Sequence, residues 1–399
     1  MTATTISRRS STVALILIAY AQFVVMGLPS GYIGAAWPSI QTEFNLPLDG
    51  VGVLLLLNTI GYSLASFFNA QVSARTGFSR GLLLGASLYA VGFAGIALAP
   101  TWWLIISFGL ITSFGAGLLD AGLNRYLAAR SNNMLLNWLH ASYGIGATLG
   151  PAGLSLLLSA GQSWRTGYWI MAAVQACVAV AMMLTLNRWE SSQVGKATAE
   201  IIQPTEAISV WKTLLVPAVW LGMFLFFVYT GIEMTAGQWT YSLFTLARGI
   251  PITVAGWWAS LYWASFTLGR IVLGFLIDRY GFARSMRAMI AGAFLGVVLL
   301  WWNPVEGVSF AGLAILGFAL APVFPTLIAV TPRALGNRMA ANAIGMEMAF
   351  GGLGIAALPW LAGYLAQRTT LEVVSPFMVV SLIIFLILFE LLMRRKADL

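Results

Sequence analysis

The sequence predicts an all-α membrane protein of twelve transmembrane helices arranged as two six-helix repeats. Of its 399 residues, 59% are hydrophobic and only 9% are charged, whereas a soluble domain carries roughly 25% charged residues. The hydrophobic residues fall in runs of about twenty, the length that a helix needs to cross the hydrocarbon core of a bilayer. No stretch shows the period-two alternation of a barrel strand, so the spans are expected to be helices.

Twelve segments are long and apolar enough to form membrane helices. Six precede and six follow a polar stretch at 188–212, which contains three Glu, two Lys and one Pro and has no apolar run. We therefore predict an N-terminal six-helix bundle at 1–187, a cytoplasmic linker at 188–212 and a C-terminal six-helix bundle at 213–399. The expected helices lie near 12–37, 49–72, 80–99, 102–127, 136–160, 166–187, 213–243, 253–277, 286–303, 307–331, 340–366 and 372–393.

The positions of the basic residues predict the orientation of the chain. Lys and Arg are concentrated in the cytoplasmic loops of membrane proteins, and most of them fall on one side of the expected helices here. Only Arg165, Arg248 and Arg368 fall on the other side. Both termini and the linker are thus expected in the cytoplasm, with the chain in a bacterial-type inner membrane or a plasma membrane. The same bias explains the net charge of +8 without a nucleic-acid partner.

The composition leaves little room for enzymatic or metal chemistry. Cys177 and His140 are the only residues of their types, which excludes an intramolecular disulfide and a zinc or iron cluster. No nucleophile–base set or phosphate-binding loop is present, so an enzyme is the least favoured interpretation. We expect no cofactor, a small molecule and the lipid bilayer as partners, and a monomeric protein.

A short motif occurs once in each half. The pattern Arg-x-Gly-Phe-x-Arg stands at 75–80 and again at 279–284, 204 residues later, each time in the loop after the second expected helix of its half. This position indicates that the two halves arose by duplication. Transporters built from such repeats bind their substrate near the membrane midplane, between the repeats.

The second copy of this motif predicts a conformational latch. Asp278 stands at a helix end, where its carboxylate can bind Arg279, Arg284 or the amino end of a neighbouring helix and be released again. In the first copy Ala70 and Ala74 replace the corresponding Gly and Asp, which weakens the case for a latch there. The alternative is an ordinary charged loop. The predicted latch residues are Gly274, Asp278, Arg279, Gly281, Arg284 and, in the first half, Arg75.

Three carboxylates lie well inside predicted helices: Asp120, Glu233 and Glu347. A charged side chain at the bilayer centre costs roughly 2.5–3.5 kcal/mol on insertion scales, so each acid needs a partner, a proton or a watery cavity. We predict that these three acids take part in proton coupling. His140 is a fourth candidate, for which the alternative is a purely structural hydrogen bond.

Amides stand beside two of these groups. Asn124 follows Asp120 by four residues, and Asn137 precedes His140 by three, so each pair shares a helix face. An acid and an amide on one face suit the recognition of a hydroxyl group or the exchange of a proton. The alternative for Asp120 is a buried hydrogen bond between helices, with Arg125 or His140.

The seventh expected helix carries the richest mixture of polar and aromatic side chains. Glu233, Gln238, Trp239 and Tyr241 combine acceptors, donors and ring faces, a mixture that suits a sugar. Small residues between them predict that this helix breaks and exposes its backbone to a cavity. In the eighth helix, Arg270 is the one arginine deep inside a span. The predicted substrate contacts are Asn124, Asn137, Gln238, Trp239, Tyr241 and Asn342.

Several of these segments resemble a known family. The stretch 274–284 resembles the signature loop of the major facilitator superfamily, although Phe282 replaces a basic residue of that pattern. Four further segments, in order along almost the whole chain, are similar to the fucose–proton symporter branch of that superfamily and its relatives similar to sodium-dependent glucose transporters. These segments are 118–124, 137–146, 231–239 and 263–270.

The resemblance implies the major facilitator fold and assigns proton coupling to the acid of the fourth helix, here Asp120. The chain departs from the branch at two places. The first helix has no acid in its segment Leu28–Tyr32, where the fucose symporters place an Asp, and Glu347 stands where an amide or a small residue is expected. The coupling scheme of the branch is therefore not carried over as a whole.

These observations predict a secondary active transporter that works by alternating access, with proton-coupled symport of a small polar solute such as a monosaccharide. The coupling ion is expected to be H⁺ rather than Na⁺. The alternative is a proton-coupled exporter of drugs or metabolites, favoured by a glycine–proline pattern at Gly146, Gly150 and Pro151, for which close packing and a kink are the structural explanation. A transporter-like sensor would be marked by a sizeable appended domain, which these residues do not contain.

Overall fold

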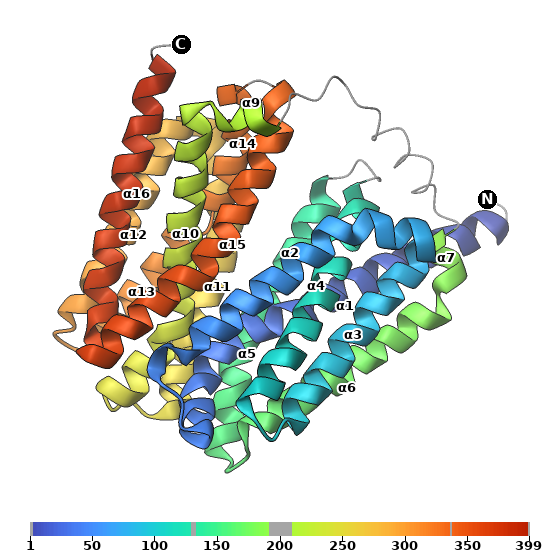
Figure 1. The fold of residues 1–399 in the computed structure, drawn as a ribbon, viewed down its shortest axis with the longest axis horizontal. Helices are drawn as coiled ribbons and strands as arrows, with labels where there is room; N and C mark the ends of the chain where they lie inside the picture. The colour runs from blue at the N-terminus through green and yellow to red at the C-terminus, as the bar shows by residue number, and fades with distance from the viewer. Residues whose placement is uncertain (1–2, 129–132, 191–209, 336, 398–399) are drawn as a thin grey trace. The chain divides into compact units, whose positions relative to one another are not determined.

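The computed structural model describes residues 3–128, 133–190, 210–335 and 337–397 (Figure 1). Within these ranges the description of side chains excludes 3–12, 274–278 and some single positions, among them Asn137. Every regular element in the described ranges is a helix. The prediction of an all-α fold is therefore confirmed.

The helices follow the predicted order, from α1 in blue to α16 in red (Figure 1). Those of the first half are α1 (Ala3–Phe44), α2 (Val51–Thr76), α3 (Phe78–Leu98), α4 (Trp102–Ala128), α5 (Asn133–Ser159), α6 (Trp164–Leu184) and α7 (Leu186–Glu190). Those of the second half are α9 (Val210–Leu214), α10 (Pro217–Ser242), α11 (Ile252–Tyr280), α12 (Phe282–Trp302), α13 (Glu306–Leu320), α14 (Val323–Leu335), α15 (Asn337–Arg368) and α16 (Val374–Ala397). Short turns of other helical types are η1 (Leu48–Gly50), η2 (Leu243–Ala247) and η3 (Leu371–Val373).

Eleven helical segments among the described residues are long and apolar enough to cross a membrane. The eighth predicted span corresponds to α11, a helix of 29 residues. The tenth predicted span is divided between α13 and α14. Proline explains the division, because Pro322 and Pro325 have no N–H to donate to the carbonyl four residues earlier. Pro325 thereby leaves the carbonyl of Ala321 without its helical partner.

The chain divides into two compact units. Unit 1 comprises 1–30 and 57–203, and unit 2 comprises 31–56 and 204–399. The outer part of α1 and the first part of α2 thus belong to unit 2, whereas the sequence assigned them to the N-terminal bundle. The predicted bundle and linker boundaries at 187/188 and 212/213 stay a prediction.

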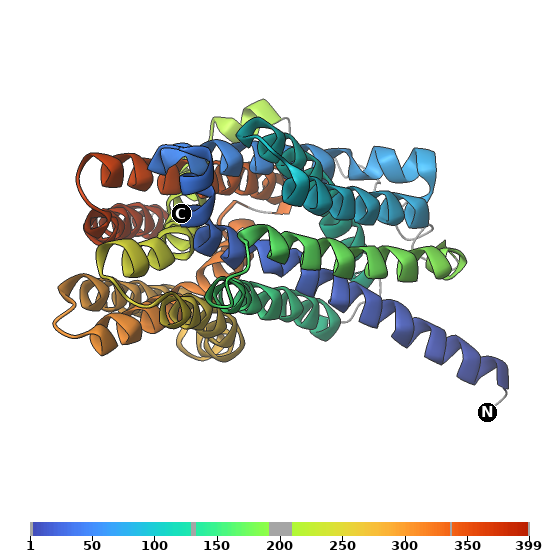
Figure 2. The ribbon, with the colours of Figure 1, turned by 90° about the horizontal axis from the view of Figure 1, so that it is seen from below.

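Glycine residues allow the helices inside each unit to approach one another closely. In unit 1, α3 lies beside α4 and α6 in both views (Figures 1 and 2), and a Cβ on Gly115 would lie 2.7 Å from the carbonyl oxygen of Gly85. In unit 2, α10 packs against α15 and α16, and a Cβ on Gly354 would lie 2.0 Å from the carbonyl oxygen of Phe227. Small residues allow such backbone approach between membrane helices.

The repeated motif has the same local structure in both halves. Gly77 ends α2 and precedes α3 with φ 88° and ψ 152°, and Gly281 ends α11 and precedes α12 with φ 81° and ψ 159°. This region of backbone conformation is accessible essentially to glycine alone. Both motifs therefore redirect the chain between two helices by the same glycine turn, which supports the interpretation of the halves as repeats.

The arginines predicted on the outer side are engaged by other protein groups. Arg165 donates to the carbonyl oxygen of Ala97 at 2.9 Å and stacks over the Trp164 ring at 4.6 Å. The guanidinium of Arg368 lies 3.6 Å from the centroid of the Tyr364 ring. Such contacts offset part of the cost of a cation outside the cytoplasmic loops.

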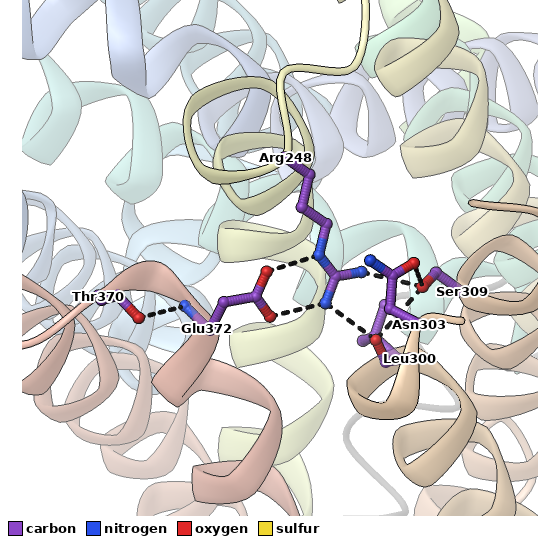
Figure 3. A network of polar contacts seen from close by, with 6 residues as sticks. All are labelled: Arg248, Leu300, Asn303, Ser309, Thr370 and Glu372. Carbon is purple, nitrogen blue, oxygen red and sulfur yellow. Dashed lines mark hydrogen bonds and ion pairs between the residues drawn. The ribbon is translucent and has the colours of Figure 1, made fainter. Parts of the chain in front are cut away.

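Arg248 joins the ends of four elements of unit 2 (Figure 3). It forms a bidentate pair with Glu372 in η3, with both N–O distances at 2.7 Å. It also donates to Ser309 Oγ at 2.9 Å and to the carbonyl oxygen of Leu300 at 3.0 Å, and Ser309 donates to Asn303 Oδ1 at 2.6 Å. This network ties the loop after α10 to α12, α13 and the start of α16.

We predict that Gly281→Ala destabilises the protein through backbone strain alone. A Cβ at Gly281 would meet no atom within 4 Å, so sterics play no part, and a non-glycine residue in this conformation costs about 1–3 kcal/mol. The thermal unfolding of the purified variant in detergent measures the effect. Gly153→Ala in α5 is the matched control, since its Cβ also meets nothing and its backbone is helical. Equal stabilities of the two variants would contradict the prediction.

We also predict that Glu372→Gln destabilises the protein more than Glu390→Gln. The Arg248 side chain is only 7% exposed, so loss of its partner leaves a largely buried cation, which costs more than loss of a surface pair. The Arg287–Glu390 pair, with side chains 52% and 33% exposed, serves as the control, with an expected cost of about 0–1 kcal/mol. A loss of stability in Glu372→Gln that is no larger than that in Glu390→Gln would contradict the prediction, because the Arg248 network would then stabilise the protein no more than an ordinary surface pair.

Candidate functional site

Asp120 on α4 is held by donors from two helices. Tyr62 on α2 donates its hydroxyl to Oδ2 at 2.5 Å, and Asn124 donates its Nδ2 to Oδ1 and to the backbone carbonyl of Asp120, each at 3.0 Å. The predicted shared face of Asp120 and Asn124 is therefore confirmed. Gly117 permits this arrangement, because a Cβ there would lie 2.4 Å from the carbonyl oxygen of Tyr62.

His140 belongs to the same cluster. It interacts electrostatically with Asp120, and its ring meets Phe23 edge-on with centroids 5.8 Å apart. One helical turn further along α5, the Tyr143 hydroxyl shares a hydrogen bond with Ser30. Unit 1 thus gathers a carboxyl, a phenol, an amide and an imidazole from α2, α4 and α5. We call Tyr62, Asp120, Asn124 and His140 the Asp120 cluster.

Close packing accounts for a glycine that the exporter alternative relied on. A Cβ on Gly146 would lie 1.9 Å from the carbonyl oxygen of Val24, and one on Gly27 would lie 2.0 Å from that of Tyr143. The helices α1 and α5 therefore touch backbone to backbone at Gly146. Pro151 lies inside α5, as the packing explanation requires.

Glu233 on α10 has a different environment from Asp120. Arg270 on α11 interacts with it electrostatically, and the Tyr229 hydroxyl, one helical turn away on α10, also interacts with its carboxyl group. The Tyr262 hydroxyl donates to the backbone carbonyl of Glu233 at 2.9 Å, and the Arg270 guanidinium stacks over Phe266 at 4.6 Å. Unit 2 thus pairs its acid with a cation, whereas the donors to Asp120 are neutral groups.

The break between α13 and α14 supplies acceptors to this second cluster. Arg270 donates its Nε to the carbonyl oxygen of Ala321 at 3.3 Å, and Tyr229 donates to that of Leu320 at 3.2 Å. Pro325 frees the Ala321 carbonyl, as described above. A half-turn of interrupted helix therefore helps to orient both the arginine and the tyrosine that face Glu233.

The predicted break of α10 is wrong. The helix runs without interruption from Pro217 to Ser242, and its glycines serve packing instead. A Cβ on Gly231 would lie 2.5 Å from Leu358, and one on Gly237 would lie 2.6 Å from the Trp263 ring. In this chain the interruption falls in the tenth span, where proline rather than glycine stands.

Gln238 and Trp263 carry buried polar atoms that have no hydrogen-bond partner. Both amide atoms of Gln238, which is 1% exposed, and the indole Nε1 of Trp263 lack one. Gly34 of α1 lies against the backbone of Gln238. Buried polar groups are paired in the great majority of cases, so an unpaired one calls for an explanation, such as a ligand.

Of the other predicted substrate contacts, Trp239 has a clear packing role. Trp239 is fully buried, donates its Nε1 to the carbonyl oxygen of Pro359 at 2.8 Å, and covers Gly363, whose Cβ would lie 2.4 Å from its ring. Tyr241 is 2% exposed. Asn342 donates to Thr213 Oγ1 at 3.4 Å, near the start of α10. A substrate contact by these three residues stays a prediction.

Glu347 on α15 lies in the interior of unit 2. It is 3% exposed, and Thr331 of α14 lies 3.1 Å and 2.9 Å from its two carboxyl oxygens. A Cβ on Gly222 would lie 2.3 Å from Oε1, so glycine there makes room for the carboxyl group. A cavity of about 20 Å³ lies beside Glu347, and one water molecule needs roughly 10–15 Å³.

The structure describes the side chains of only some of the residues predicted to form the latch. The side chains of Gly274 and Asp278 lie outside the described residues, as does that of Asn137 among the predicted substrate contacts. Arg75 and Arg284 are exposed, and the Arg279 guanidinium lies 5.5 Å from the centroid of the Tyr280 ring. The role of these residues as a latch stays a prediction.

Sequence reasoning missed Tyr62, Tyr229 and Trp263 as members of the clusters. Tyr62 reaches Asp120 from a different helix, and spacing along one helix gives no signal for such a pair. Tyr229 stands four residues before Glu233 on α10, so helical spacing did offer a signal for it. For Trp263 the signals were its place in the segment 263–270 and in the aromatic segment of the eighth span, which was equally consistent with an interfacial belt.

The chain was compared with known proteins by sequence. It matches the Major Facilitator Superfamily model over residues 18–247 and 239–398. It is similar to Bypass of stop codon protein 6 of Saccharomyces cerevisiae, at 25% identity over 386 residues, with 88% of this chain and 76% of the relative covered. It is also similar to the glucose/mannose transporter GlcP of Bacillus subtilis, at 21% identity over 376 residues, with 92% of both chains covered.

Solved structures share the fold. The nucleoside transporter NupG, in a mutant form, superposes with a TM-score of 0.80 at 14% identity, covering 96% of this chain and 99% of the other. A D-xylose–proton symporter gives a TM-score of 0.69 at 16% identity, covering 94% and 97%. With a family match through both halves and the fold of solved members, the chain belongs to the Major Facilitator Superfamily and is a multi-pass membrane transporter.

Proposed function

We propose that the protein is a proton-coupled symporter of a monosaccharide, with Asp120 as a proton-binding residue. The observation that carries the proposal is the contrast between the surroundings of two acids, Glu233 and Asp120. Glu233 faces Arg270, which balances its charge, whereas the described hydrogen-bond donors to Asp120 are the neutral Tyr62 and Asn124. His140, the charged neighbour of Asp120, is titratable, whereas Arg270 is a permanent cation. A carboxyl group in a membrane that is not balanced by a permanent cation lowers its cost by taking a proton.

Protonation of Asp120 changes the contacts between α2 and α4. The unprotonated carboxylate accepts from both Tyr62 and Asn124. A protonated carboxyl has one oxygen that donates, so it cannot accept a hydrogen bond at that oxygen in the same way. The bond to Tyr62 or to Asn124 must then rearrange, which couples the proton to the packing of two helices. His140, through its electrostatic interaction with Asp120, provides a titratable neighbour for proton exchange.

The donors around Asp120 favour H⁺ over Na⁺ as the coupling ion. A hard cation binds several oxygen acceptors at once. Here a phenol O–H and an amide N–H point at the carboxylate, and no group of three or more His, Cys, Asp or Glu side chains that could hold a metal ion occurs among the residues searched. These groups suit a carboxyl that exchanges a proton.

Glu347 is proposed as a second proton-binding residue. The Thr331 hydroxyl has one hydrogen, yet it lies within bonding distance of both carboxyl oxygens and of the Leu327 carbonyl oxygen at 3.2 Å. It can serve one of them at a time. No cation contacts Glu347 in the part of the chain whose side chains are described, so a proton is the simplest compensation for its burial.

A monosaccharide is the proposed substrate because of Gln238 and the similar proteins. The amide of Gln238 and the indole N–H of Trp263 offer one acceptor and three donors without partners, which match sugar hydroxyl groups. The similar proteins include one named as a glucose/mannose transporter and one named as a D-xylose–proton symporter. The packing role of Gly146 gives this glycine a structural explanation that does not depend on export. We further propose cytoplasmic termini, from the distribution of basic residues.

We predict that Asp120→Asn abolishes accumulation of sugar but preserves exchange of sugar across the membrane. The amide cannot take up the proton, so a pH gradient no longer drives transport, while the substrate contacts remain. Proteoliposomes with an imposed gradient, tested with labelled glucose, mannose and xylose, should show at least about a tenfold loss of accumulation, a difference of about 1.4 kcal/mol in driving free energy. Counterflow without a gradient should stay close to wild type.

The control for this experiment is Glu306→Gln, at the exposed start of α13. It removes a carboxylate that lies far in sequence from every acid assigned a role. Gradient-driven accumulation that persists in Asp120→Asn would show that this residue is not the proton site. Loss of both accumulation and counterflow in Glu306→Gln would show that the assay reports on folding instead.

We predict that Gln238→Leu weakens sugar binding and stabilises the sugar-free protein. An unpaired buried polar group costs about 1–3 kcal/mol, and an apolar side chain of similar size removes this cost. Thermal unfolding with and without sugar measures both effects. Gln175→Leu is the matched control, because Gln175 is paired with Gln22 at 2.9 Å and with the Ala86 carbonyl at 3.2 Å, and its loss should destabilise. A Gln238→Leu variant of lower stability would assign Gln238 a structural role.

A further inference from the structure

Unit 2 contains an apolar groove that the proposed transport mechanism does not use. It has a volume of about 700 Å³ and lies between α11, α12 and α13. Ser265, Leu273 and Tyr280 line it on α11, Ala288 on α12, and Ala314 on α13. We call it the α11–α12–α13 groove. None of the residues of the Asp120 cluster, and neither Gln238 nor Trp263, lines it.

The groove has a structural cause in the contact between α11 and α13. The two helices touch at two glycines, since a Cβ on Gly269 would lie 2.3 Å from the Phe318 carbonyl oxygen and one on Gly317 would lie 2.6 Å from the Tyr262 carbonyl oxygen. Beyond these two contacts the groove extends along α11 toward Tyr280, and Leu273 and Tyr280 line it there.

The length of the groove matches one leaflet of a bilayer. Its lining on α11 extends from Ser265 to Tyr280, which corresponds to about 22 Å along a helix axis. One leaflet of a bilayer, including its headgroup region, measures about 20–22 Å. The walls are apolar, so water has too few polar partners to fill the space. In a membrane, the surrounding medium that can fill it is an acyl chain.

One end of the groove carries positive charge. Arg284, in the first turn of α12, and Tyr280, at the end of α11, line this end and are exposed. Arg279 lies beside it, with its guanidinium 5.5 Å from the centroid of the Tyr280 ring. Arginine binds phosphate oxygens through its planar set of donors. No acidic side chain lines the groove among the described residues.

We propose that the α11–α12–α13 groove binds an anionic phospholipid, with an acyl chain along the apolar walls and the phosphate group at Arg284. The ligand needs both an acyl chain and a phosphate group. The apolar walls make no favourable interaction with a free phosphate ion, and Arg284 makes none with a neutral hydrocarbon chain. Such a lipid would fill the space between α11 and α12. The proposal is independent of the identity of the transported solute.

The test uses the full-length protein, purified in detergent, stripped of lipid and incubated with equal amounts of phosphatidylglycerol and phosphatidylcholine of identical acyl chains. Native mass spectrometry then counts the lipids that remain bound. We expect wild type to retain phosphatidylglycerol at least about fivefold over phosphatidylcholine. Arg284→Gln should lose this preference, and Ala288→Phe, which fills the groove from the exposed face of α12, should retain neither lipid at this site.

Two matched variants separate the groove from general effects. Arg80→Gln removes the arginine at the equivalent place of the first motif, and Ala291→Phe adds the same ring to α12 at an exposed position that does not line the groove. Both should bind lipid as wild type does. Equal retention of the two lipids by wild type, or unchanged retention in both Arg284→Gln and Ala288→Phe, would overturn the proposal. Thermal unfolding of each variant confirms that it is folded.

Discussion

Polar groups inside this protein must find their partners within the protein, because the hydrocarbon of a bilayer offers none. The rest of the structure depends on this constraint. Helices satisfy their own backbone, and the acids and arginines then use whatever donors and acceptors the neighbouring helices expose. Arg248 is the fullest example, since its guanidinium binds a carboxylate, a hydroxyl group and a backbone carbonyl group.

The same constraint explains why a broken helix is useful in unit 2. Proline removes backbone donors between α13 and α14 and leaves carbonyl groups that would be costly if unpaired. Arg270 binds the carbonyl group of Ala321, which Pro325 leaves free, and Tyr229 binds that of Leu320 at the end of α13. Both side chains then lie where they can face Glu233. An interruption of the backbone therefore contributes directly to the environment of an acid on another helix.

The two units share a turn but differ in their polar sites. Gly77 and Gly281 have nearly the same backbone angles, which is what duplication of one half would leave. The acids have diverged, because Asp120 is held by neutral donors and Glu233 faces a cation. The divergence therefore leaves the two units with two different electrostatic environments for a carboxyl group.

The sequence predicted the helices well because hydrophobic length is a local property. It also predicted the pairing of Asp120 with Asn124, which follows from helical spacing within one element. It did not predict Tyr62, because contacts between helices depend on which glycines allow close approach. It passed over Tyr229, although this residue stands one helical turn before Glu233 on α10. The glycines of α10 suggested a break in the helix, yet in the structure they make room for the side chains of Leu358 and Trp263.

The most informative comparison concerns Trp239 and Gln238, which are adjacent in the sequence. Both were predicted to contact substrate, and both are almost fully buried. Trp239 has its only donor occupied by Pro359, whereas Gln238 has no partner for either amide atom. Residue type and spacing cannot separate these cases, because the difference lies in which helix each side chain faces. An unsatisfied buried amide costs stability that selection would otherwise remove, so of these two neighbours it is Gln238 whose burial packing alone does not explain.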